Sequence, residues 1–273
     1  MAKIIGIGNA LLDSEFVVDD TQLALSGLTK GNMTLASDSE QAELIGFLSE
    51  QGVSASKQAS GGSAANSIFA MASLGSDTFY ACRVGDDANG EWYLADLNNA
   101  GIKTAAKSVA IGGTTGTCMV LVSPEGERTM QTHLGTSAEI NENDIEFEQL
   151  VDADWLYLEG YLAMSPSIQD GIAQMRHIAS THQTKVAVSF ADPAVVKFGR
   201  QGLDNMLGNG VDVVFCNREE ALLYTGKDNI ADAAKALLKV TKLAFLGQIA
   251  VNVIAIMLVI LPHQFGNAFP IFS

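Results

Sequence analysis

Short apolar segments alternate with amphipathic segments along most of this 273-residue chain, and this alternation restricts the fold more than any other feature. The apolar segments indicate buried strands, and the segments between them carry helix signals, such as the capping box at Ser37. Such an alternation predicts βαβ units and hence an α/β fold with a doubly wound, Rossmann-like, mostly parallel sheet. The predicted strands are Lys3–Gly8, Thr78–Val84, Trp155–Glu159, Lys185–Phe190 and Val211–Cys216. The predicted helices are Ser37–Gln51, the apolar run Ile68–Leu74 that follows Gly61 and Gly62 and ends at Gly75, Gly90–Ala100, Ser167–Thr181, Arg218–Tyr224 and Ile230–Lys239.

Two regions interrupt this alternation with short β-prone pieces. Glu15–Val18 and Met33–Ala36 lie near the N-terminus, and Thr117–Val122 and Arg128–His133 flank the turn Ser123–Glu127. These pieces predict a small sheet, formed from about 14–36 and 103–133, that acts as a lid over a site from which water is excluded. Edge strands of the main sheet, or a homodimer interface, are the alternatives that the pattern leaves open.

Charge and composition exclude several classes of protein. The formal net charge is 16 − 31 = −15, which argues against a nucleic-acid partner, because phosphate backbones require basic patches. The three cysteines are widely spaced, which predicts reduced thiols in a cytoplasmic protein, and the four histidines show no metal-ligand spacing. The N-terminal sequence has no signal-peptide pattern.

Gly61 and Gly62 begin the most informative local sequence, Gly-Gly-Ser-Ala-Ala-Asn-Ser. Glycine allows backbone amides to approach a ligand closely, and a helix start offers free N–H groups and partial positive charge. Asn66, one turn into the helix, adds a donor and an acceptor. The combination suits a polyhydroxylated or anionic small molecule, although a lone Gly-Gly is also a common turn before a helix.

Polar residues follow several of the predicted strands. Asn9 and Asp13 come after the first strand, and Glu159 ends the strand that begins at Trp155. Ligands of parallel α/β sheets bind beyond the carboxyl ends of the strands, so these side chains are predicted to bind a sugar. Asn217 follows another strand and precedes Glu220; the pair predicts either an ordinary helix cap or a site for hydrated Mg²⁺ and phosphates.

These residues together resemble the ribokinase-like, or PfkB, carbohydrate kinases, and in detail the adenosine-kinase-like branch of that family. The family's first signature is matched by Gly61, Gly62, Asn66, Gly75 and Gly85, and its Asn-x-x-Glu motif by Asn217 and Glu220. The resemblance covers roughly residues 3 to 242 and is specific in combination.

The resemblance implies a doubly wound domain with a β lid, and transfer of the γ-phosphoryl group of ATP, with Mg²⁺, to a sugar or nucleoside hydroxymethyl group. Through it, the acceptor-side residues would be Asn9, Asp13, Gly61, Gly62, Asn66 and Glu159. Asn217 and Glu220 would bind the nucleotide phosphates, with Glu220 next to the metal ion.

The sequence departs from the family at one important motif. The Gly-Ala-Gly-Asp sequence, which supplies an anion hole and the catalytic aspartate, does not occur, so no catalytic residue is assigned. This predicts an impaired kinase by descent, or alternatively a non-catalytic protein that binds a sugar or nucleoside. An oxidoreductase is a weak third possibility, because Gly6-Ile7-Gly8 is an incomplete dinucleotide fingerprint.

After Lys242 the composition changes abruptly, so the predicted domain is 1–242 and the predicted apolar tail is 243–273. Three interpretations of the tail remain open: replacement of the normal C-terminal end by a frameshift or truncation, which is favoured; a membrane anchor over 243–261; or a buried part of a shortened fold. Gln248 and Asn252 weaken the anchor interpretation.

Overall fold

The computed structural model describes residues 1–105 and 107–247, and its centre is a sheet of seven parallel strands. Nearly all side chains of the inner strands are buried, as expected where helices cover both faces of a parallel sheet. In spatial order the strands are β14 (Thr241–Leu246), β13 (Val211–Cys216), β12 (Lys185–Ser189), β11 (Trp155–Leu158), β1 (Lys3–Ile7), β5 (Asp77–Ala81) and β7 (Lys103–Thr104). The predicted doubly wound α/β fold is confirmed.

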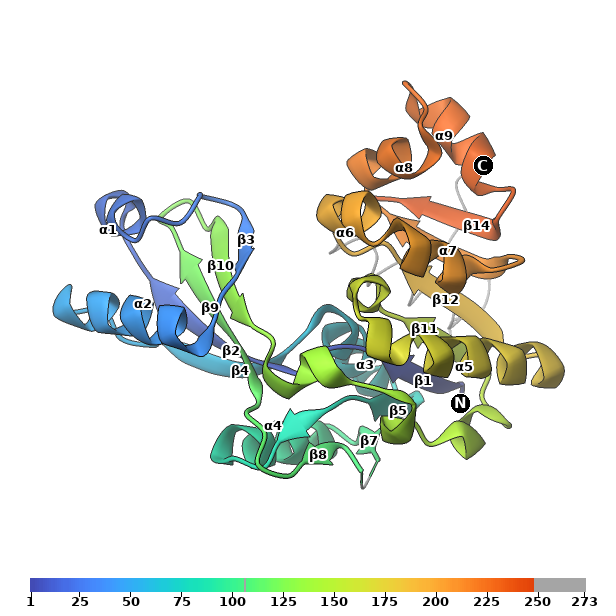
Figure 1. The fold of residues 1–273 in the computed structure, drawn as a ribbon, viewed down its shortest axis with the longest axis horizontal. Helices are drawn as coiled ribbons and strands as arrows, with labels where there is room; N and C mark the ends of the chain where they lie inside the picture. Colours follow the sequence, from blue (N-terminus) through green and yellow to red (C-terminus); the bar gives the residue numbers. More distant parts are fainter. Residues whose placement is uncertain (106, 248–273) are drawn as a thin grey trace.

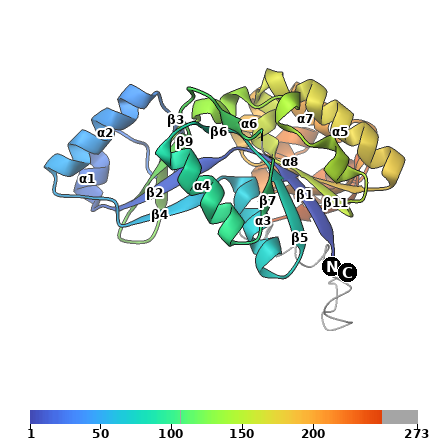
Figure 2. The same ribbon diagram turned by 90° about the horizontal axis from the view of Figure 1, so that it is seen from below.

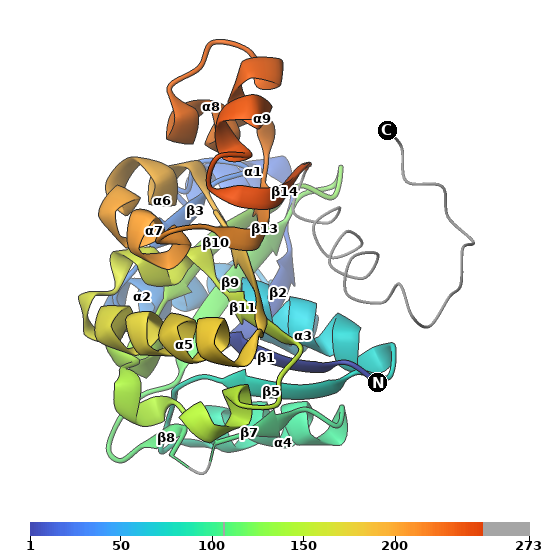
Figure 3. The ribbon, with the colours of Figure 1, turned by 90° about the vertical axis from the view of Figure 1, so that its right-hand side faces the viewer.

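Helices pack on both faces of this main sheet. Alternate residues of each strand face opposite sides, so Ile4 belongs to one apolar core and Ile5 to the other. One face carries α3 (Ser63–Ser73) and α4 (Ala88–Asn99), and the other carries α5 (Gln169–His182), α6 (Pro193–Phe198), α7 (Arg200–Leu207), α8 (Arg218–Thr225) and α9 (Ile230–Leu237). Figure 3 shows α5, α6 and α7 on one side of the strands and α3 on the other.

A separate five-stranded sheet, called the small sheet below, lies beside the main sheet (Figures 1 and 2). Its strands are β3 (Met33–Leu35), β10 (Arg128–His133), β9 (Gly116–Val122), β2 (Leu11–Val17) and β4 (Lys57–Gly61). Helices α1 (Asp20–Leu25) and α2 (Asp38–Glu50) cover one of its faces, where Phe16, Leu48 and Leu121 form an apolar core. The β-prone pieces are therefore not edge strands of the main sheet.

Several predicted boundaries differ from the observed ones. Strand β2 begins at Leu11, so Asp13 lies within a strand, and the polar strand β4 lacks the apolar pattern that would have revealed it. The predicted strand Thr78–Val84 is divided between β5 and a short strand, β6 (Val84–Gly85), which pairs with β8 (Val109–Ala110). Residues 103–104 were predicted to belong to the small sheet, but they pair with β5 in the main sheet.

The predicted domain boundary at Lys242 falls inside a strand, because β14 continues to Leu246 along its whole pairing with β13. Residues 248–261 of the proposed membrane anchor lie outside the described residues. Within 1–105 and 107–247, no helix has both the length and the apolarity that crossing a membrane requires. The remaining elements are the 3₁₀ turns η1 (Gly135–Glu139), η2 (Glu142–Asp144), η3 (Phe147–Leu150), η4 (Gly160–Met164) and η5 (Pro166–Ile168).

Candidate functional site

The segment that follows β1 crosses from the main sheet to the small sheet, and the Glu159 carboxylate holds it in place. Glu159 is fully buried at the end of β11 and accepts hydrogen bonds from the backbone N–H of Asn9 (2.7 Å) and of Ala64 (2.9 Å), and from the Ser63 hydroxyl (2.5 Å). Burial raises the pKa of Glu159, and these donors partly offset the effect. Glu159 thus joins the end of β1 to the start of α3.

Gly61 and Gly62 allow three segments to meet without steric conflict. Gly62 precedes α3 with φ of 105°, and a Cβ there would lie 2.3 Å from the carbonyl oxygen of Asn9. A Cβ on Gly61 would lie 2.1 Å from Oδ1 of Asp13. Tyr93 donates its hydroxyl to the Gly61 carbonyl at 2.9 Å. Gly61 is the last residue of β4 and not part of a turn. An added Cβ at either glycine would make a close contact.

Asp13 presents its carboxylate beside Gly61 with little internal support. Its side chain is 23% exposed, and Arg128 of β10 lies 3.9 Å from Oδ2. Burial raises the pKa of Asp13 to about 6, although the positive charge of Arg128 opposes the shift. No hydrogen bond to this carboxylate is found within residues 1–105 and 107–247. The oxygens of Asp13 are thus available to hydroxyl donors of a ligand.

Asn9 precedes Asp13 by four residues, contacts Glu159 through its N–H and is only 6% exposed. Its backbone carbonyl accepts the Tyr80 hydroxyl at 2.9 Å, but its side-chain Oδ1 is buried with no hydrogen-bond partner in the described part of the chain. An unsatisfied buried acceptor costs roughly 1–3 kcal/mol, so it calls for a donor. Asn66 is exposed on the first turn of α3, where its N–H donates to the Gly62 carbonyl.

Asn217 and Glu220 form a reciprocal capping box at the start of α8. The Asn217 side chain accepts the Glu220 N–H at 2.8 Å, while the Glu220 carboxylate accepts the Asn217 N–H at 2.9 Å and its side-chain amide at 2.7 Å. Burial raises the pKa of Glu220 to about 7, and the charges of Asp192 and Glu219 add to the shift. The ordinary helix-cap interpretation therefore applies, and it leaves lone pairs on both carboxylate oxygens.

Asp192 and Tyr161 belong to the same edge of the sheet, although the sequence analysis did not identify them. Asp192 follows β12 after Ala191, whose φ of 68° is unusual for a non-glycine residue. Burial raises the pKa of Tyr161, with contributions from Asp192, Glu159 and Glu220. Tyr161 lies in η4, which directly follows Glu159. The rule that identified Asn9, a polar residue just beyond a strand, would also have identified Asp192.

The donor set near Glu220 is compatible with Mg²⁺. No group of three His, Cys, Asp or Glu side chains able to hold a metal is present in residues 1–105 and 107–247. Mg²⁺, however, keeps several water ligands and usually binds through one or two carboxylates together with substrate phosphates. Glu220 and Asp192 supply such carboxylates. Two surface hollows, along α8 and beside the start of β13, contain none of the predicted site residues.

Comparisons with known proteins agree with this arrangement. An ATP-dependent ribose-1-phosphate kinase of Halopiger xanaduensis is 30% identical over 189 residues, which are 66% of this chain and 59% of that protein. The adenosine kinase structure from Sinorhizobium meliloti has a TM-score of 0.79 and 33% identity, and covers 89% of this chain and 73% of its own. The structure of a probable sugar kinase from Rhizobium etli CFN 42 has a TM-score of 0.79 and 29% identity, and covers 90% of this chain and 74% of its own.

The chain therefore spans 59% of the length of that curated relative. The model of the pfkB family carbohydrate kinases matches residues 27–246, so the match reaches past Lys242 to the end of β14 but begins after Asn9 and Asp13. The match includes the Gly61–Gly62 pair and the Asn217–Glu220 capping box. From the family match and the shared fold, we conclude that this chain belongs to the pfkB family of carbohydrate kinases, which are phosphotransferases.

Proposed function

We propose that this chain binds the hydroxymethyl-bearing acceptor of an ATP-dependent kinase, a sugar or a nucleoside, beside Asp13. The observation that carries the proposal is the state of two side-chain acceptor groups four residues apart in the chain. The Asp13 carboxylate has no hydrogen-bond donor within the described residues, and neither has the buried Oδ1 of Asn9. A polyhydroxylated ligand has the donors that both lack. The ribose-1-phosphate kinase and adenosine kinase relatives support this class of acceptor.

The residues of the site would have different roles. Asp13 and Asn9 would accept hydrogen bonds from hydroxyl groups of the acceptor, and Asn66 would contact it from α3. Gly61 and Gly62 would allow the small sheet to approach it closely. Glu159 would act as a positioning residue, because both of its oxygens already accept internal hydrogen bonds. The small sheet would serve as the lid that excludes water.

The phosphate side would lie at the start of α8. Asn217 and Glu220, with Asp192, would hold hydrated Mg²⁺ and the nucleotide phosphates through oxygen donors. Bound ATP would supply the γ-phosphoryl group, and Mg²⁺ would neutralise its developing charge. The N-terminal N–H groups of α8 would add favourable electrostatics toward anions.

Equilibrium binding and turnover measurements on the 273-residue chain test this proposal. We expect calorimetry to detect binding of at least one among adenosine, guanosine, ribose and ribose 1-phosphate. We expect ATP-dependent turnover to be at least about 100-fold below that of an active family member, because the sequence contains no Gly-Ala-Gly-Asp aspartate to orient the hydroxyl. Binding without turnover would support the second candidate, a non-catalytic acceptor-binding protein. Failure of the whole panel to bind would contradict both.

We also propose that the open face of the small sheet pairs with a second copy of the chain. Val17 and Leu35 are exposed, and the strand register places both on the face of Asp13, opposite α1 and α2. Light scattering after gel filtration should report a dimer that Val17→Lys converts to a monomer. Leu25→Lys, an exposed apolar residue on α1, should leave the dimer intact. A monomeric unmodified chain at micromolar concentration would contradict the proposal.

A further inference from the structure

The connections between the two sheets converge on the hydroxyl of Ser137. Ser137 lies in η1, directly after the small sheet returns to the main domain through β10, and is 1% exposed. Its Oγ accepts the Ala10 N–H at 3.0 Å and lies within hydrogen-bond distance of two carbonyl oxygens, those of Ala10 (3.0 Å) and Arg83 (3.1 Å). Ser137 therefore links the two connections between the sheets. It lies on the connection that follows β10 and contacts Ala10 on the connection from β1 to β2.

A hydroxyl group has one proton, so Ser137 donates to only one of the two carbonyls at a time. Donation to Ala10 fixes both polar groups of that residue, whereas donation to Arg83 ties η1 to the end of β5. The Ala10 N–H contact persists in both cases, because it uses a lone pair of Oγ. The N–H of Ala10, just before β2, is thus held by a side chain and not by a sheet partner.

This contact lies next to the proposed acceptor site. Ala10 follows Asn9, whose own N–H is held by Glu159, so two buried side chains hold consecutive peptide groups. The position of the Asn9 side chain depends on both contacts. Asp13 lies three residues further along the chain, in β2, so displacement of Ala10 would also move its carboxylate.

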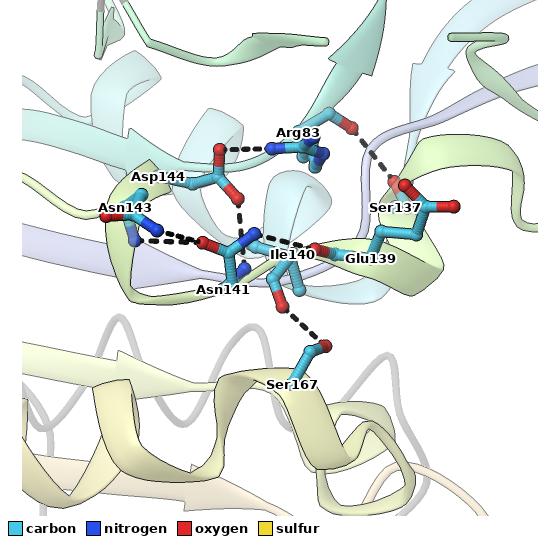
Figure 4. Close-up of polar contacts among 8 residues, drawn as sticks. All are labelled: Arg83, Ser137, Glu139, Ile140, Asn141, Asn143, Asp144 and Ser167. Carbon is cyan, nitrogen blue, oxygen red and sulfur yellow. Dashed lines mark hydrogen bonds and ion pairs between the residues drawn. The ribbon is translucent and has the colours of Figure 1, made fainter.

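The segment that carries Ser137 is itself anchored, as Figure 4 shows. Arg83 donates to Asp144 at 2.7 Å, and Asp144, which is buried, accepts the Asn141 N–H at 2.9 Å. Ser167, just before α5, donates to the Ile140 carbonyl at 2.8 Å. These contacts hold the 135–144 segment against the main domain and thereby fix the position of Ser137.

We propose that Ser137 is a positioning residue, which holds the Asn9–Ala10 segment and thereby sets the geometry of the acceptor side and of the small sheet above it. The positioning itself rests on the hydrogen bonds of Ser137. Its effect on ligand affinity rests on the proposed function, so the two parts have separate measurements.

Hydrogen exchange compares Ser137→Ala with the matched control Ser167→Ala, which removes one hydroxyl from the same network without contacting Ala10. Loss of two hydrogen bonds should accelerate amide exchange across 9–17 by at least about tenfold in Ser137→Ala and by less than about threefold in the control. Equal acceleration in both variants, or none in Ser137→Ala, would overturn the positioning role. If Ser137→Ala does not fold, amide exchange at Ala10 is measured in the unmodified chain. Rapid exchange there would refute the hydrogen bond between the Ala10 N–H and Ser137.

Acceptor affinity provides the second measurement. Ser137→Ala should weaken binding of the tightest panel member by about tenfold, and Ser167→Ala should not. Unchanged affinity in Ser137→Ala would refute the link to the acceptor site. If exchange responds as expected but the unmodified chain binds no panel member, the proposed function fails and the positioning role of Ser137 stands.

Discussion

Replacement of Asp13 by asparagine is expected to weaken acceptor binding by about 100-fold or more, because hydrogen bonds to a charged group each contribute roughly 1.5–3 kcal/mol. The carboxylate can accept hydrogen bonds from two neighbouring hydroxyls, whereas the amide presents one acceptor oxygen and two donors. The same substitution should raise the stability of the ligand-free protein at neutral pH. Binding and stability therefore change in opposite directions.

The gain in stability follows from the raised pKa of Asp13, about 6 in the folded chain against an ordinary value of 3.8. Between these values the folded state binds more protons than the unfolded state, so stability falls as pH rises. Above about pH 6 the folded chain bears the full cost of a charged Asp13, which is at most about 3 kcal/mol. Asparagine does not ionise, so its advantage should be absent below pH 4, grow between pH 4 and 6, and then remain constant.

Chemical denaturation from pH 3.5 to 8, with calorimetry of acceptor binding at pH 7.5, measures both effects. Asp20→Asn is the control, since Asp20 is an exposed carboxylate of α1 paired with Lys30. It should leave binding unchanged and alter stability by less than about 1 kcal/mol at every pH. Equal binding by Asp13→Asn and the unmodified chain would remove Asp13 from the site. A stability difference independent of pH would contradict the raised pKa.

Five strands of the main sheet, β1, β5, β11, β12 and β13, were predictable because each has its own apolar run, whereas α6, α7 and β14 were not predicted. Val211–Cys216 was predicted to the residue. Strand β4 was not predictable, because Lys57–Gly61 is stabilised by pairing with β2 and has no apolar pattern. Assignment of β5 and β6 to different sheets likewise depends on contacts between distant segments, which the local sequence does not contain.

The candidate site was predictable where a residue type and its place after a strand were sufficient, as for Asn9. Internal contacts were not predictable. Glu159 has the expected position, at the end of a strand. Its carboxylate oxygens, however, accept hydrogen bonds from Ser63 and from two backbone amides, all in segments far from Glu159 in the sequence. The local sequence around Ser137 does not indicate its role, because that role depends on a contact between two connections that are far apart in the sequence.

Replacement of Gly62 by alanine is expected to cost about 3 kcal/mol or more of stability and to abolish acceptor binding. Its φ of 105° is unfavourable for any side chain, and the added Cβ would lie 2.3 Å from the carbonyl oxygen of Asn9. That oxygen belongs to the backbone and also accepts the Tyr80 hydroxyl, so it cannot move without breaking a buried hydrogen bond. Thermal unfolding should therefore shift downward by about 10 °C.

Two further alanine variants separate the possible causes of this effect. Gly46→Ala, in the middle of α2 with no atom near the added Cβ, should be neutral or slightly stabilising and should bind normally. Gly61→Ala meets the Asp13 carboxylate and not a backbone atom, so the side chain can turn away. It should unfold at a temperature closer to that of the unmodified chain, yet lose as much acceptor affinity as Asp13→Asn. If Gly61→Ala retained full affinity, the close packing of these glycines against Asp13 would be a requirement of the fold alone.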